Sequence, residues 1–107
     1  VALELLDEDF FMYVEELEFC FRAKKKGWKV WYVPQTNIIH YGGASGNREG
    51  TVLGEFRGLK LFYKKHFPLY LFFLRLGLAI ASFVRIIVFA MMSPGKSKVY
   101  AKALRSI

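Results

Sequence analysis

The chain has one cysteine, three prolines and, beyond residue 50, a single acidic side chain. A lone cysteine excludes a disulfide-stapled scaffold, and an unpaired thiol fits a reducing compartment. Disorder is excluded as well, because 54% of the residues are hydrophobic and 18% are aromatic, which is enough apolar surface to offset the entropy of ordering the chain. A length of 107 residues allows one small domain or a piece of a larger one.

The acidic residues are concentrated in the first half, so the two halves differ in charge. Residues 1–50 carry six Lys or Arg and eight Asp or Glu, a net charge of −2. Residues 51–107 carry ten Lys or Arg and one Glu, a net charge of +9, and the whole chain has a net charge of +7. A strongly basic half indicates an anionic partner, either nucleic acid or the cytoplasmic face of a membrane.

The first half predicts one helix and two strands. Residues 9–27 begin with acidic side chains and end with three lysines and Gly27, the order that a helix dipole and a glycine cap favour. Residues 29–33 and 37–41 are rich in β-branched and aromatic side chains, so each predicts a short strand. Three aromatic side chains here are expected in a core: Trp28, Trp31 and Tyr32.

The second half predicts membrane-associated helices. Residues 51–67 predict a helix whose polar face is basic, as in helices that lie on a membrane surface. Residues 68–93 predict an apolar helix with two charges, Arg75 and Arg85, that is long enough to cross a bilayer. Residues 94–107 predict a basic cytoplasmic tail.

The two arginines leave the mode of membrane association open. An arginine in the middle of a spanning helix costs about 2.5–3.5 kcal/mol, whereas each Leu, Ile, Phe or Val returns only about 0.3–0.6 kcal/mol. The alternatives are a spanning helix and a pair of interfacial helices with their arginines at lipid phosphates. A long aliphatic run has no place on a nucleic-acid-binding surface, so we expect an anionic membrane and no nucleic acid as the partner, at the cytoplasmic face of the cell membrane.

A series of short motifs gives a more specific hypothesis. An aromatic run precedes an acidic run, and a Gly-Trp pair, a Val-Pro pair and a His-x-Gly-Gly loop follow in order: Phe10-Phe11-Met12-Tyr13, Glu15-Glu16-Leu17-Glu18, Gly27-Trp28, Val33-Pro34 and His40-Tyr41-Gly42-Gly43. This order resembles the C-terminal part of the family 2 glycosyltransferases of GT-A type, in particular the rhamnosyltransferase-like enzymes of bacterial surface polysaccharide synthesis. The resemblance implies an α/β fold, with residues 1–50 as the C-terminal part of the catalytic domain and membrane-associated helices after it.

The same resemblance implies an activity and its residues. The family inverts the sugar configuration as it transfers a sugar from a nucleotide-diphosphate donor to a glycan or lipid-linked acceptor. Glu16 matches the acid that acts as general base on the acceptor hydroxyl, and Glu15 could hold acceptor hydroxyls. His40 matches a histidine that helps to bind a divalent metal, Mg²⁺ or Mn²⁺, or the donor diphosphate. The loop beside it would let backbone N–H groups approach phosphate at Gly42, Gly43 and Ser45.

Two further expectations qualify this hypothesis. Arg22 is expected to bind neighbouring carboxylates rather than substrate. The family's Asp-x-Asp metal motif is missing, so we expect the C-terminal portion of a longer enzyme, inactive alone, or a truncated remnant. Acidic residues at a helix start are also common as capping groups, and a non-catalytic membrane-binding module is therefore the alternative function.

Overall fold

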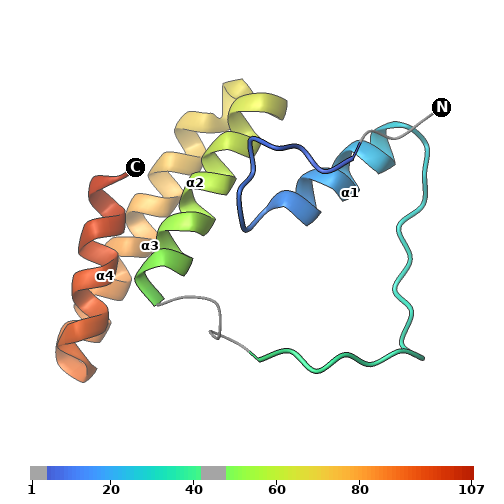
Figure 1. Ribbon diagram of the computed structural model, residues 1–107. Coiled ribbons are helices and arrows are strands. Elements are labelled where there is room, and N and C mark those ends of the chain that lie inside the picture. Colours follow the sequence, from blue (N-terminus) through green and yellow to red (C-terminus); the bar gives the residue numbers. More distant parts are fainter. Residues whose placement is uncertain (1–4, 42–47) are drawn as a thin grey trace.

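Helices make up all the regular secondary structure in residues 5–41 and 48–107, the part of the chain that the computed structural model describes (Figure 1). In chain order they are α1 (Glu15–Lys25), α2 (Arg48–His66), a short 3-10 turn η1 (Pro68–Tyr70), α3 (Leu71–Met92) and α4 (Pro94–Arg105). The expectation of an α/β fold, the C-terminal fragment of a GT-A domain, is therefore wrong for the described residues, which contain no strand.

The two predicted strands form an exposed, irregular segment instead. Every residue from Lys24 to Tyr41 is exposed, and the expected core aromatics are open to solvent, with Trp31 75% and Tyr32 89% exposed. A strand is stabilised by hydrogen bonds and side-chain packing against a neighbouring strand. The described residues supply no such neighbour to residues 28–41, so β-branched and aromatic composition alone does not make a strand.

Helix α1 begins later than the sequence predicts and ends where it predicts. Tyr13 and Val14 have φ angles of 70° and 74°, a left-handed conformation that interrupts any helix starting at residue 9. The helix then begins with acidic residues in its first turn and basic residues in its last, which complements its dipole. Gly27 closes it at φ 85°, and the Trp28 N–H donates to the Ala23 carbonyl at 3.0 Å.

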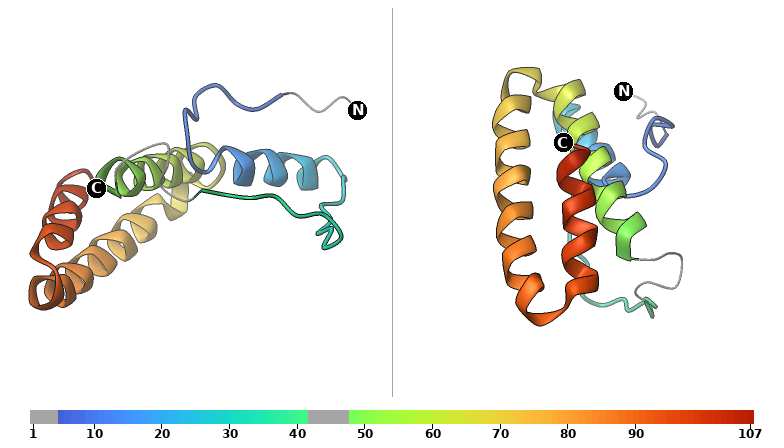
Figure 2. Two further views of the ribbon diagram at one scale, coloured as in Figure 1. Left: turned by 60° about the horizontal axis from the view of Figure 1, so that its bottom comes forward. Right: turned by 90° about the vertical axis from the view of Figure 1, so that its left-hand side faces the viewer.

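Helices α2, α3 and α4 lie side by side, with α4 returning antiparallel to α3 (Figure 2). A small core forms where they meet, around Val52 and Phe56 of α2 and Ala103 of α4, which is fully buried. Phe89 and Tyr100 stack across the α3–α4 contact with ring centroids 5.7 Å apart. The predicted helices over residues 51–67 and 68–93 are thus confirmed in outline by α2 and α3.

Helix α4 was not predicted, because its basic residues are typical of an unstructured tail. Its apolar residues Val99, Tyr100 and Ala103 nevertheless recur at helical spacing and pack in the core, as does Ile107 just beyond its end. Pro94 occupies the first turn, where its missing N–H has no partner to lose. Those two signals together would have predicted this helix.

Candidate functional site

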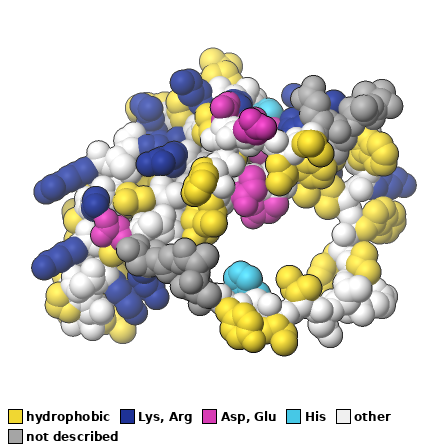
Figure 3. Space-filling view, viewed as in Figure 1, with side chains coloured by type: hydrophobic (Ala, Val, Ile, Leu, Met, Phe, Trp, Pro, Cys, Tyr) yellow, Lys and Arg dark blue, Asp and Glu magenta, His cyan; other side chains and the backbone are white. Residues whose placement is uncertain are grey.

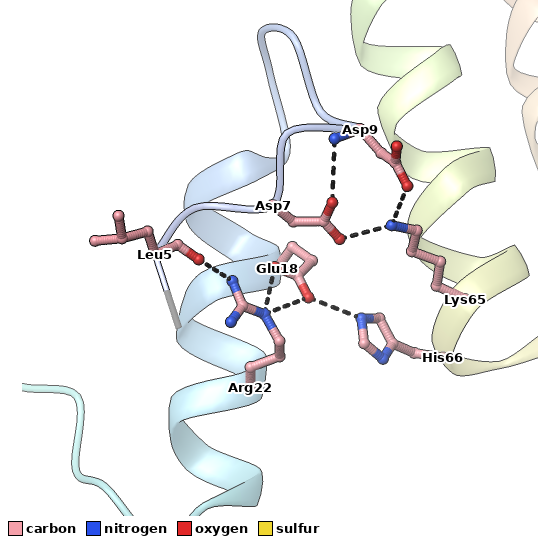
Figure 4. Close-up of polar contacts among 7 residues, drawn as sticks. All are labelled: Leu5, Asp7, Asp9, Glu18, Arg22, Lys65 and His66. Carbon is pink, nitrogen blue, oxygen red and sulfur yellow. Dashed lines mark hydrogen bonds and ion pairs between the residues drawn. The ribbon is translucent and has the colours of Figure 1, made fainter. Parts of the chain in front are cut away.

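The best-connected polar cluster joins α1 to the end of α2 (Figure 4). Glu18 is only 1% exposed, and the Arg22 Nε lies 2.7 Å and 2.8 Å from its two carboxylate oxygens. His66 Nε2, from the last turn of α2, lies 3.1 Å from Glu18 Oε1. Arg22 also donates to the Leu5 carbonyl at 2.8 Å, which holds the preceding segment against α1. The expectation that Arg22 binds a neighbouring carboxylate is confirmed.

A second ion-pair group ties the segment before α1 to α2. Lys65 Nζ lies 2.7 Å from Asp7 Oδ2 and 2.5 Å from Asp9 Oδ2 (Figure 4). The hydrogen bond from Lys65 lowers the pKa of the Asp7 carboxyl below its ordinary value of 3.8. The same hydrogen bonds to Asp7 and Asp9 raise the pKa of Lys65 above 10.5. These residues, expected to start a helix, instead anchor a loop to α2.

The two residues with left-handed backbone before α1, Tyr13 and Val14, pack against glycines of α2. A Cβ added to Gly58 would come within 2.7 Å of the Tyr13 carbonyl oxygen, and one added to Gly54 within 2.7 Å of the Tyr13 ring. The Tyr13 hydroxyl lies 3.0 Å from Thr51 Oγ1. Because a β-branched residue such as Val14 rarely adopts φ near 74°, this contact holds the backbone in a strained conformation.

A cavity of about 440 Å³ lies between this loop and α2. Its wall is largely apolar, and Asp9 and Arg57 are its only charged lining residues; the apolar ones include Phe10, Phe11, Met12, Leu53 and Leu61. A cavity of this size and lining suits an apolar chain or ring better than a sugar.

The predicted catalytic residues lie at the beginning of α1, beside the ion-pair cluster. Glu16 is exposed, whereas Glu15 is half-buried and its Oε2 is buried without a hydrogen-bond partner among the described residues. The acid that the structure holds most firmly, Glu18, was not among the predicted site residues. Its spacing of four from Arg22 is a readable signal for a helical ion pair, but its contact with His66, 48 residues away, is not.

The predicted cofactor residues are not gathered into a site by the described residues. His40 lies in the exposed segment before residue 42, and Gly42, Gly43 and Ser45 lie outside the described residues. In the described part of the chain, no three His, Cys, Asp or Glu side chains are grouped so that they could hold a metal ion. The described residues therefore do not fit a divalent metal, which stays a prediction for a longer enzyme.

Helix α3 presents the most unusual surface of the molecule. Six large apolar side chains follow each other at steps of three or four residues, and we call them the outer face of α3: Phe73, Leu76, Ile80, Phe83, Ile87 and Met91. They are between 49% and 87% exposed. The span Pro68–Met92 is the one described helix that is long and apolar enough to cross a membrane.

The two arginines of α3 avoid the outer face. Each lies five residues from Ile80, which at about 3.6 residues per turn puts it on the opposite half of the helix. The Arg85 guanidinium lies 5.5 Å from the ring centroid of Tyr100 in α4. Arg75 is close enough to Lys60 of α2 to lower the pKa of its ammonium group, although burial is the larger cause of that shift. Both guanidinium groups thus lie towards the basic helices.

Lys and Arg side chains gather over α2 and α4, at the left of Figure 3. Helices α2, α3 and α4 thus form a group with basic side chains over α2 and α4 and a bare apolar face on α3. Comparison with known proteins adds no relative: no protein-family model, no curated protein sequence and no solved structure matches this chain. The resemblance to glycosyltransferases consequently remains a prediction from the motifs.

Proposed function

We propose that this chain attaches to an anionic membrane surface, with α3 lying along the boundary between headgroups and hydrocarbon. The observation that carries the proposal is the outer face of α3, which leaves six large apolar side chains uncovered along the whole helix. Soluble monomers rarely expose a continuous apolar patch of this kind. A cytoplasmic leaflet, which is rich in anionic lipid, would attract the basic residues of α2 and α4.

The packing of α4 supports an interfacial position over a spanning one. Helix α4 lies along α3 and carries four basic residues, of which Lys98, Lys102 and Arg105 are exposed. If α3 crossed the bilayer with α4 attached, these charges would enter the hydrocarbon, each at a cost of about 2.5–3.5 kcal/mol. With α3 in the membrane plane, the outer face inserts and the charges stay at the phosphates.

The test compares one substitution at two exposed isoleucines. Ile80→Asp places a charge on the outer face, and Ile38→Asp places the same charge in the segment before α2, where the isoleucine is 88% exposed. Burial of an isoleucine side chain stabilises by about 1.5–3 kcal/mol, so Ile80→Asp should weaken partitioning into phosphatidylcholine–phosphatidylglycerol vesicles by more than about tenfold. Ile38→Asp should change it by less than about fivefold, the effect of one charge near the surface. Equal effects of the two substitutions would refute the proposed face, and wild-type protein that fails to bind anionic vesicles at low salt would refute membrane attachment.

A second proposal concerns the beginning of α1: Glu16 acts as general base in sugar transfer from a nucleotide-diphosphate donor. The observation that favours it is a contrast between two carboxylates of the first turns of α1. Glu18 is paired with Arg22 and His66, whereas Glu16 is exposed to solvent. A general base must reach the acceptor hydroxyl, and only an uncommitted carboxylate can do so. This proposal uses the motif resemblance and not the α/β fold, which the described residues do not have.

The full-length gene product provides the test of sugar transfer, measured as release of nucleoside diphosphate from a panel of nucleotide sugars. Glu16→Gln should lower the rate by about 10²–10⁴-fold, the usual contribution of a general base. Glu8→Gln, which neutralises another exposed glutamate, is the matched control and should leave the rate unchanged. Activity of Glu16→Gln at the wild-type rate would exclude Glu16 as the base.

A further inference from the structure

Cationic residues of α2 and α4 line one small cavity. It has a volume of about 320 Å³ and is lined by Leu53, Arg57 and Lys60 of α2 together with Lys102 and Ser106 at the α4 end. Arg75 of α3 lies near enough to act on Lys60. Helices α2 and α4 thus bring three cations, Arg57, Lys60 and Lys102, to one cavity, and Arg75 of α3 adds a fourth positive charge nearby.

These cations have few anionic partners among the residues that the structure describes. Lys102 pairs with Glu49 at 2.5 Å, and Lys60 Nζ donates to the Ser106 carbonyl. No ion pair within residues 5–41 and 48–107 involves Arg57, Lys60 or Arg75. Burial, together with the charges of Arg75 and Arg57, lowers the pKa of Lys60, so folding disfavours the charged form of this side chain.

Crowded like charges destabilise a fold unless an anion offsets them. An arginine fork with one or two ammonium groups is the arrangement that recognises phosphate oxygens, since the guanidinium binds them in pairs and lysine acts as a point charge. Three of the five residues that line the cavity are cations, so its charge favours an anionic ligand over an apolar or neutral one. A phosphate group fits its charge.

The cavity also adjoins the apolar cavity beside the loop before α1. Leu53 and Arg57 line both, so one side of α2 carries a cationic cavity and, next to it, an apolar one of about 440 Å³. A ligand with a phosphate and a hydrocarbon chain would use both. Lipids of this type are at hand if the chain lies on a membrane as proposed above.

We propose that the cavity lined by Arg57, Lys60 and Lys102 binds the phosphate-monoester headgroup of a membrane lipid, with part of its hydrocarbon in the neighbouring apolar cavity. This proposal rests on the proposed membrane attachment and adds a preference among anionic lipids. Attachment by the outer face of α3 and a general attraction of the basic residues would respond to surface charge and not to the kind of headgroup.

The experiment measures partitioning of the full chain onto two sets of vesicles matched in zeta potential, one containing phosphatidic acid and the other phosphatidylserine. The readout is the ratio of the two partition coefficients, from which general membrane affinity cancels. We expect a ratio of at least about 10 for the wild-type chain, because a monoester phosphate offers more oxygens to a guanidinium fork than a diester does. Arg57→Gln and Lys60→Gln should bring the ratio close to 1.

Lys64→Gln is the matched control, because Lys64 is an exposed lysine on the same helix and does not line either cavity. It should weaken binding to both vesicle types by up to about fivefold and leave the ratio unchanged. Glycerol 3-phosphate and inorganic phosphate are added separately to identify the source of the phosphate. At 1 mM neither should release the chain from phosphatidic acid vesicles.

The outcomes separate the two proposals. A wild-type ratio close to 1 with strong binding to both vesicle types would overturn the headgroup site and leave membrane attachment standing. Loss of the ratio in Lys64→Gln to the same extent would also overturn it. Release by 1 mM glycerol 3-phosphate or inorganic phosphate would assign the cavity to a soluble phosphate and overturn the lipid headgroup. Absence of binding to every vesicle would overturn both proposals.

Discussion

Replacement of Arg22 by methionine should destabilise the chain strongly, because it leaves a buried carboxylate without its main partner. Glu18 is 1% exposed and both of its oxygens lie within 2.8 Å of the Arg22 Nε, so only the 3.1 Å contact with His66 would remain. Breaking a buried ion pair on one side costs about 3–5 kcal/mol. Arg22 is itself 17% exposed, so water can reach the vacated position and the loss should lie at the lower end, about 3 kcal/mol. For a chain with a total stability of about 5–15 kcal/mol, that is a large share.

The assay is urea denaturation of the full chain bound to vesicles, in which the circular dichroism signal of the helices reports unfolding. The double variant Glu18→Met/Arg22→Met removes both charges and should recover to within about 1 kcal/mol of the wild type, since a well-packed apolar pair can replace a buried ion pair. Lys24→Met, on the exposed side of the same helix, should change stability by less than about 0.5 kcal/mol. A loss of stability in Arg22→Met no larger than that in Lys24→Met would refute the role of this ion pair, as would a double variant that is as unstable as the single one.

Three further predictions concern the contact between the loop before α1 and α2. Gly58→Ala should lower the free energy of unfolding by about 1–3 kcal/mol, because its Cβ would meet the Tyr13 carbonyl oxygen at 2.7 Å. A Cβ at Gly77 has no neighbour within 4 Å, so Gly77→Ala should raise stability by about 0.5–1 kcal/mol. Equal effects of the two substitutions in a denaturation experiment would contradict the close contact. Lys65→Met should lose about 0.5–1 kcal/mol, the usual value for partly exposed ion pairs, and no loss at low salt would show that the loop is held otherwise. The stabilisation by Lys65 should depend on pH at two ends. The lowered pKa of Asp7 stabilises the fold above about pH 4, and this stabilisation is lost as the pH falls through the pKa of the folded state. The raised pKa of Lys65 stabilises the fold below about pH 10.5, and this stabilisation is lost as the pH rises through the pKa of the folded state. The difference in stability between the wild type and Lys65→Met should therefore be constant between about pH 5 and pH 10, and a difference that vanishes near pH 7 would exclude this pairing.

The elements that could be predicted from the sequence are those whose signal lies within the element. Helix α3 is apolar apart from Arg75 and Arg85, α2 combines apolar and basic residues at helical spacing, and Gly27 marks the end of α1. The beginning of α1 could not be predicted, because the left-handed conformation of Val14 depends on its contact with Gly58, 44 residues further along.

The predicted strands failed for a related reason. The preference of residues 29–33 and 37–41 for a sheet is a preference for packing against a neighbouring strand, which the described residues lack. For the candidate site, the spacing of Glu18 and Arg22 within α1 was readable, while the convergence of Lys60 and Lys102 on one cavity follows from the antiparallel return of α4. No spacing rule predicts a contact between side chains on separate helices.

The orientation of α3, which we propose lies in the plane of the membrane, can be measured directly. Polarised infrared spectroscopy of oriented phosphatidylcholine–phosphatidylglycerol bilayers, with isotope-labelled carbonyls at Ala79 and Ala81, reports the angle of this helix alone. Spanning helices tilt by about 0–40° from the bilayer normal. An angle beyond about 60° is the result we predict for an interfacial helix, and an angle within the spanning range would contradict the account.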